Sequence, residues 1–135
     1  MSGKRVVITG VGMVTSLARS APDSWSSILT GKSGVKKIMS FDTEKLPCKI
    51  ASEISDFKAE DYITPGDVRK MDRFIHLGIA AAIEAVEDSN ILPQTDYDKD
   101  RTGVIIGSGI GGLSTIEKTS VEFHNSARGK VSPYF

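Results

Sequence analysis

The sequence predicts an α/β fold, in which strands buried in a mainly parallel sheet alternate with helices. Residues 5–9 and 102–106 are short apolar runs rich in β-branched side chains, and each ends at a glycine turn, which is typical of strands buried on both faces. Between these runs, apolar residues recur every three or four positions from residue 68 to residue 86, which indicates a long helix. The expected order is strand, helix, hairpin, helix, strand, helix, without an internal repeat.

The first strand is expected at residues 5–9, and the glycine turn of residues 10–12 ends it. Lys4 and Arg5, followed by residues 6–18 with small residues at their end, also resemble a secretory signal peptide and its cleavage site. Glycines and threonines interrupt the stretch, however, and a signal peptide needs a continuous apolar segment. The interruptions favour a strand followed by a turn.

A short helix is expected at residues 21–31. Ser20 can cap its first turn, Pro22 fits the first turn because it needs no hydrogen-bond donor there, and Gly31 provides the left-handed residue that ends a helix. The connection that follows, residues 32–61, has a weaker pattern. Only residues 49–54 alternate between apolar and polar side chains, which predicts a small edge strand or a hairpin arm.

The long helix has the strongest signals of the sequence. Thr64 is its expected N-cap, Pro65 occupies the first helical position, and Asp67 follows in the first turn. Residues 78–83 are small and apolar nearly all round, which indicates a helix buried over most of its circumference. We expect this helix to end at residues 89–90.

The C-terminal third predicts a second strand and a further helix. A polar loop at residues 93–101 leads into the strand at 102–106, and a glycine-rich loop at 107–112 leads into a helix at 113–123. Gly107, Gly109 and Gly112 match the dinucleotide-binding fingerprint of glycines between a strand and a helix. In that fingerprint an acidic residue further along the chain binds the ribose, and none follows here at the needed distance. The glycines can equally serve a plain tight turn, so a small nucleotide-binding protein is the weaker of the two interpretations.

Composition fits a globular chain and excludes several classes of function. The 135 residues are 39% hydrophobic and 25% charged, so the chain is neither disordered nor collagen-like. Seventeen basic side chains balance seventeen acidic ones, so we expect no nucleic acid and no anionic membrane as a partner. The longest apolar run, residues 77–83, is far below the roughly 18 residues that span a bilayer.

The residues that could carry cysteine or metal chemistry are few. Cys48 is the single cysteine, which excludes an internal disulfide and favours a reducing, cytoplasmic location. It lies near no expected helix N-terminus that would lower the pKa of its thiol, so we interpret it as an inert structural thiol. His76 and His124 lack the spacing of a shared metal site, and we expect both to be solvent-facing or hydrogen-bonded rather than catalytic.

Several segments together resemble the N-terminal part of the β-ketoacyl-acyl-carrier-protein synthases, above all the elongating enzymes of bacterial fatty acid synthesis. Each segment occurs in the family's order, and the resemblance covers the whole chain. The matching segments are residues 5–13, 31–35, Phe41 with Asp42, 69–74, 107–112 and 132–135. The resemblance implies one part of the N-terminal half of a thiolase-like sandwich with five αβαβα layers.

The resemblance also implies a function and a set of residues. The family condenses an acyl-enzyme with malonyl-carrier protein in a decarboxylative Claisen reaction, works as a homodimer in the cytoplasm, and needs no cofactor or metal. The acyl pocket and its gate would comprise Gly109, Ile110 and Phe135. Docking of acyl carrier protein would involve Arg69, Lys70 and Lys130.

The family's catalytic cysteine, two histidines and lysine have no counterparts among residues 1–135, which we expect to form a partial domain that stops before the nucleophile. We therefore expect these residues to be inactive alone, because no acyl-enzyme can form without a nucleophile. A partial domain should also expose apolar surface. The alternative is a non-catalytic module, derived from such a synthase, that binds carrier protein or a partner subunit.

Overall fold

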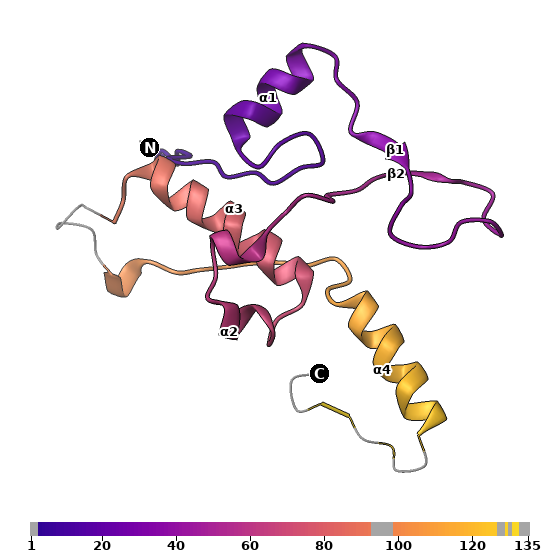
Figure 1. Ribbon diagram of the computed structural model, residues 1–135. Helices are drawn as coiled ribbons and strands as arrows, with labels where there is room; N and C mark the ends of the chain where they lie inside the picture. The colour runs from indigo at the N-terminus through magenta and orange to yellow at the C-terminus, as the bar shows by residue number, and fades with distance from the viewer. Residues whose placement is uncertain (1–2, 93–98, 127–128, 130, 133–135) are drawn as a thin grey trace. The chain divides into compact units, whose positions relative to one another are not determined.

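The computed structural model describes residues 3–92, 99–126, 129 and 131–132 (Figure 1). The chain forms two compact units, Met1–Phe57 with Ala80–Tyr97, and Lys58–Ile79 with Asp98–Phe135. The described elements, in chain order, are α1 (Ala21–Leu29), β1 (Val35–Lys37), β2 (Ile50–Ser52), the 3-10 helix η1 (Ala59–Asp61), α2 (Pro65–Val68), α3 (Arg73–Ser89), the 3-10 helix η2 (Lys99–Arg101) and α4 (Leu113–Asn125).

In the first unit, helix α1 forms as its capping residues predict. The Ser20 hydroxyl accepts a hydrogen bond from the Asp23 N–H at 3.3 Å, and Pro22 lies in the first turn, where a missing N–H costs nothing. Thr30 caps the C-terminus, and Gly31 follows it with φ at +70°, a left-handed conformation that glycine adopts without strain.

The hairpin of the first unit is the two-stranded antiparallel pair β1 and β2, in which Val35 faces Ser52 and Lys37 faces Ile50. This pairing confirms the hairpin arm predicted at residues 49–54. Beyond the pair, the Ser40 hydroxyl and the Met39 N–H both donate to the carboxylate of Glu53. These bonds, the Ser40 bond above all, hold the pKa of Glu53 below its usual range.

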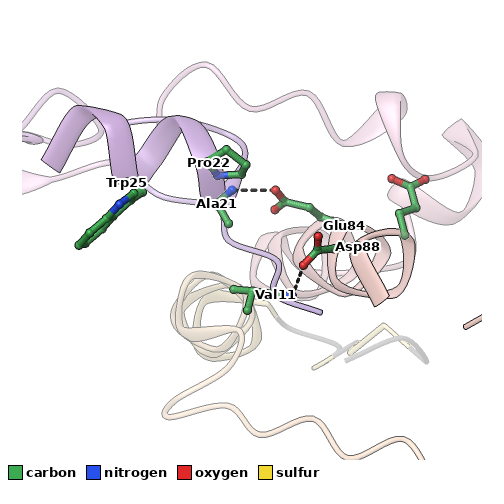
Figure 2. A pocket seen from close by; sticks show the side chains of 7 residues that line it. Val11, Ala21, Pro22, Trp25, Glu84 and Asp88 are labelled. Carbon is green, nitrogen blue, oxygen red and sulfur yellow. Dashed lines mark hydrogen bonds between the residues drawn. The ribbon is translucent and has the colours of Figure 1, made fainter. Parts of the chain in front are cut away.

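Residues 10–13, which include the glycine turn, are held against α3 by two carboxylates. The Val11 N–H donates to Asp88 at 2.9 Å (Figure 2). The Met13 N–H donates to Glu84 at 2.7 Å. Glu84 also accepts from the Ala21 N–H at 2.7 Å, which joins the start of α1 to the same helix (Figure 2). Two residues of extended chain span about 6.6 Å. Four residues of helix rise about 6 Å, nearly the same length. The Val11 and Met13 N–H groups, two residues apart, therefore match the spacing of Asp88 and Glu84, four residues apart on the helix.

Glycine is required at positions 10 and 12 because the main chain there touches the main chain of α3. A Cβ atom at Gly12 would overlap the carbonyl oxygen of Ala81, and one at Gly10 would overlap that of Ala85. The opposing atoms are backbone atoms and cannot swing aside. The two glycines therefore permit an approach that any side chain would prevent.

In the second unit, the long helix predicted from Pro65 to the end of α3 is broken, so that prediction is wrong in this respect. Helix α2 begins as expected, with Thr64 as N-cap, but ends at Val68, and α3 begins at Arg73. At the break the hydrogen bonds change from four-residue to three-residue spacing. In an unbroken helix the Val68 oxygen would accept from the N–H four residues on, whereas here it accepts from the Met71 N–H at 3.4 Å and from Nε2 of His76 at 3.1 Å.

The two expected strands are not strands among the described residues, and their predicted burial is wrong. Val6 is 94% exposed and Ile105 is 99% exposed. A strand of a parallel sheet is stabilised by neighbouring strands on both sides and by helices over both faces. In the part of the chain that the structure describes, residues 6–8 and 104–106 have no adjacent strand.

The buried core is correspondingly small, and residues 78–83 of α3, predicted to be buried, are half-buried except for the buried Ala80. The buried hydrophobic residues among those described are Phe57, Ala59 and Ala80. Residues 75–85 contain no exposed position, which agrees with a helix surrounded on most sides. The exposure of large apolar side chains elsewhere confirms the expected apolar surface. No described helix is long and apolar enough to span a membrane.

Substituting Gly12 tests the close approach to α3. We expect Gly12→Ala to lower the free energy of unfolding by about 1–3 kcal/mol, the usual cost of overpacking, because its Cβ meets a main-chain oxygen. Gly78→Ala is the matched control, since no atom lies within 4 Å of a Cβ there, and alanine favours a helix by about 1 kcal/mol. Urea denaturation measures both. Equal midpoints for Gly12→Ala and the wild type would contradict the packing described.

Candidate functional site

The second unit contains two hollows that share a wall. One hollow has about 420 Å³. It lies between four residues of α3 and a segment made of Ile106 and the start of the glycine-rich loop, residues 107–109; the α3 residues are Phe74, Ile75, Gly78 and Ile79. The other, of about 370 Å³, is lined by residues 69–72, Phe74, Ile75, Thr115, Thr119 and Ser132. Phe74 and Ile75 line both, so an apolar hollow and a hollow with two basic residues lie side by side.

The glycine-rich loop supplies one wall of the apolar hollow. Gly107 and Gly109 line it, and a Cβ at either position would meet no atom within 4 Å. Ile110 follows directly but does not line the hollow, and its side chain is 72% exposed. Phe135, the third residue that the sequence assigns to the acyl pocket, lies outside the described residues. The structure thus brings Gly109 to an apolar hollow next to Phe74.

The basic hollow contains the first two predicted docking residues. Arg69 and Lys70 line it, and both are exposed. The ammonium group of Lys70 is 3.1 Å from an oxygen of Asp67, in an ion pair across one turn. Lys130, the third predicted docking residue, lies outside the described residues.

Two neighbours lower the pKa of Asp67. The Thr64 hydroxyl donates to its carboxylate at 2.8 Å, and the Lys70 ammonium donates to the other oxygen. The Thr64 bond contributes most, and the Lys70 bond and charge add to it, so the pKa of Asp67 lies below its usual range. An acidic partner that binds Lys70 must therefore compete with a carboxylate that is already in place.

Asp72 joins the basic hollow to the glycine-rich loop, and the sequence analysis did not single it out. The Thr115 hydroxyl donates to one oxygen of its carboxylate. The other oxygen lies so close to Gly112 that a Cβ there would overlap it. Because Gly112 begins α4 without a side-chain cap, an acid at this point also faces the positive end of the helix dipole.

A sequence signal for Asp72 does exist. Leu113, the first residue of α4, follows two glycines, which cannot cap a helix with a side chain. The uncapped start of a helix favours an acid nearby through its dipole, but the sequence does not say which acid lies there. Phe74 has no such signal, because its place beside Gly111, where a Cβ would lie 3.5 Å from the ring, depends on residues far apart in the sequence.

The histidines have the structural roles expected of them. His76 is 8% exposed, and because a carbonyl can only accept, its Nε2 donates to the Val68 oxygen. His124 lies exposed in the last turn of α4. Cys48 is exposed between β1 and β2, and its Sγ donates to the Ile50 oxygen at 3.4 Å. Among the described residues, no three metal-ligating side chains gather to hold an ion.

A third hollow, in the first unit, has about 440 Å³ and is lined by Val11, Trp25 and the acids of α3 (Figure 2). Glu84 and Asp88 there already accept hydrogen bonds from main-chain N–H groups. Both acids therefore have a structural role within the first unit. The two hollows of the second unit are the better candidate for a functional site.

Comparison of the sequence with known families gives one consistent result. The family model described as "Beta-ketoacyl synthase, N-terminal domain" matches residues 3–135. The chain is 43% identical to 3-oxoacyl-acyl-carrier-protein synthase 2 of Vibrio cholerae over its whole length, and 41% identical to the Staphylococcus aureus enzyme of the same name over 98% of its length. It spans about a third of these relatives, 32% of each.

Comparison with solved structures identifies the fold. A ketosynthase in complex with its type II polyketide acyl-carrier protein, "AntDE:AntF", aligns with a TM-score of 0.73 at 26% identity, over 97% of this chain and 35% of that one. The ishigamide ketosynthase/chain length factor also gives 0.73, at 24% identity over 95% of this chain and 32% of that one. These likenesses confirm the predicted fold class, part of a thiolase-like α/β fold.

Thr64 offers a test of the electrostatics beside the basic pair. Removing its hydroxyl in Thr64→Ala should raise the pKa of Asp67 toward its usual value, because the largest stabilisation of the ionised form is lost. Lys70→Ala should raise the pKa less. Carboxyl chemical shifts followed through a pH titration measure both, with Lys118→Ala as a distant control. A lowered pKa for Asp67 contributes stability above its unfolded value, and that contribution disappears as pH falls through the folded value.

Proposed function

The chain belongs to the β-ketoacyl synthase family, and from that premise we propose that it serves a 3-oxoacyl-acyl-carrier-protein synthase of fatty acid biosynthesis as the part that binds acyl chain and carrier protein. In that reaction a cysteine thiolate takes the acyl group from its carrier thioester and releases the carrier thiol. Malonyl-carrier protein loses carbon dioxide. The resulting carbanion attacks the acyl-enzyme, and a 3-oxoacyl-carrier protein forms as the cysteine thiolate leaves.

One observation carries this proposal, namely the two hollows that share Phe74. An acyl-carrier protein presents an apolar chain at the end of a polar arm, on an acidic surface. Its receptor needs an apolar cavity close to basic side chains. The second unit has both features within one stretch of α3 and the residues before it.

We assign the acyl pocket and its gate to Gly109, Ile110 and Phe135. Gly109 supports the assignment because it lines the apolar hollow. Ile110 is exposed beside it, as a side chain that closes over an incoming chain would be before that chain arrives. The assignment of Phe135 rests on the family's pattern alone.

We assign carrier docking to Arg69, Lys70 and Lys130. Arg69 and Lys70 support it because they are exposed, adjacent and of one sign on a chain with zero net charge. Such a patch steers an acidic partner and sets its orientation more than it raises affinity. The similar polyketide ketosynthase is described as a complex with an acyl-carrier protein.

Residues 1–135 on their own carry no condensing activity in this proposal. Cys48 is the one cysteine of the sequence, and it lies exposed in a loop between β1 and β2. A nucleophilic cysteine needs a base or a helix N-terminus that lowers the pKa of its thiol. The remaining catalytic groups of such a synthase would come from residues beyond these. The enzyme would work as a homodimer in the cytoplasm, where a free exposed thiol is stable.

A second candidate is a non-catalytic module that binds carrier protein or a partner subunit. The exposed β-branched residues at 6–8 and 104–106 favour it, since a partner could cover them. Dinucleotide binding at the glycine-rich loop has less support. The Asp72 carboxylate lies against Gly112 at the start of α4, where that fingerprint places the pyrophosphate, and a carboxylate there would repel a second anion.

The absence of activity is directly measurable. We expect the purified chain to form no 3-oxoacyl product from octanoyl- and malonyl-carrier protein, because it offers no activated nucleophile. A radiochemical condensation assay against a no-enzyme blank decides this, and a Cys48→Ala variant shows whether any signal depends on the single thiol. Turnover above the blank would refute the proposed lack of activity.

Carrier docking is tested by reversing the charge of the basic pair. Arg69→Glu with Lys70→Glu should weaken binding of acyl carrier protein about tenfold or more, because two attractive contacts become repulsive. Isothermal titration at two salt concentrations measures the effect, which should shrink as salt screens it.

The hairpin supplies a matched control for this experiment. Lys36 and Lys37 are another adjacent basic pair, exposed on β1 in the first unit. Reversing both changes net charge by the same amount, so only a local docking role distinguishes the two variants. If both double variants weaken binding equally, the effect is one of net charge and the docking assignment fails.

A further inference from the structure

Two short segments of the second unit meet around one carboxylate. Residues 69–74 begin with the basic pair and end with Phe74. Residues 110–115 begin with Ile110 and end with Thr115. The first segment thus starts with the proposed docking residue Arg69 and the second with the proposed gate residue Ile110. Asp72 of the first segment and Thr115 of the second form the hydrogen bond between them.

The contacts between the segments leave the glycine turn little freedom. The Thr115 hydroxyl donates to Asp72, and the Asp72 carboxylate carbon lies 2.7 Å from where a Cβ of Gly112 would be. The Phe74 ring lies 3.5 Å from the corresponding position of Gly111. Movement of this turn toward α3 must therefore displace Asp72 or Phe74.

Asp72 is also fixed to the segment that carries the basic pair. Its carbonyl oxygen accepts from the Ile75 N–H at 3.0 Å and the His76 N–H at 3.3 Å, which starts α3. His76 in turn donates to the Val68 oxygen, so Arg69 and Lys70 lie in a short bridge between two bonded ends. A ligand that pulls on this bridge changes the position of Asp72.

We propose that Asp72 is a positioning residue that couples carrier docking at Arg69 and Lys70 to the position of Ile110 beside the apolar hollow. When an acidic partner takes Lys70 from Asp67, the bridge shifts, and the bond from Thr115 transmits the shift to the glycine turn. The coupling rests on the proposed function, because it presumes both ligands. It is reciprocal, so an acyl chain that displaces the same turn strengthens docking.

The experiment separates the two ligands. The first ligand is a carrier protein without its prosthetic arm, which can reach only the docking surface, and the second is free octanoyl-pantetheine, which can fill only the apolar hollow. The affinity of the chain for the armless carrier is measured by titration without and with saturating octanoyl-pantetheine. We expect the wild type to bind the carrier about fivefold more tightly when the acyl ligand is present.

Four variants identify the residue responsible. Asp72→Ala and Thr115→Val should each reduce the fivefold effect to about one, while each ligand still binds singly. Asp72→Asn should keep the effect, because its amide oxygen can still accept from Thr115. Thr119→Val is the matched control, because Thr119 lines the same basic hollow as Thr115, one turn further along α4. This variant should also keep the fivefold tightening of carrier binding.

The outcomes distinguish this proposal from the function on which it rests. If the wild type binds each ligand but shows no mutual effect, the coupling is refuted and the docking assignment stands. If Asp72→Asn loses the effect, or Thr119→Val loses it as Thr115→Val does, Asp72 does not act through this bond and the proposal fails. If the wild type binds neither ligand, the proposed function fails as well. Should Asp72→Ala lose both ligands through misfolding, Thr115→Val decides.

Discussion

Close approach of glycine main chain to helix α3 and to the residues that precede it is the constraint on which both units depend. In the first unit Gly10 and Gly12 touch main-chain oxygens of α3, while Asp88 accepts from the Val11 N–H and Glu84 from the Met13 N–H. In the second unit Gly111 and Gly112 lie against Phe74 and Asp72. A carboxylate lies at both glycine turns; it accepts from main-chain N–H groups in the first unit and from the Thr115 hydroxyl in the second. The glycines of both turns permit close packing in this chain.

The helices could be predicted because their signals are local. Ser20 and Thr64 accept from N–H groups three residues on, and these caps need no information from elsewhere in the chain. The break before α3 is different, because there the Val68 oxygen accepts from the Met71 N–H and from the His76 ring, eight residues later in the chain. The apolar periodicity reports which positions are apolar and carries no information about a side chain that bonds a main-chain oxygen.

The candidate site shows the same division between local and distant information. Arg69, Lys70 and Gly109 could be named from motifs, and the structure places all three at adjoining hollows. Asp72 and Thr115 are 43 positions apart, and no pattern in the sequence joins them. The strands at residues 5–9 and 102–106 were predicted from intrinsic preference, but a parallel strand forms only beside neighbours, which the described residues do not supply.

The central claim is that the second unit receives an acyl carrier protein at residues 69–74 and passes its chain toward residues 107–112. Amide chemical shifts of the labelled chain, followed while octanoyl-carrier protein is added, test that claim most directly. The account predicts that shifts concentrate in these two segments and leave the hairpin of β1 and β2 unchanged. Shifts confined to the hairpin or to α1, with residues 69–74 unaffected, would contradict it.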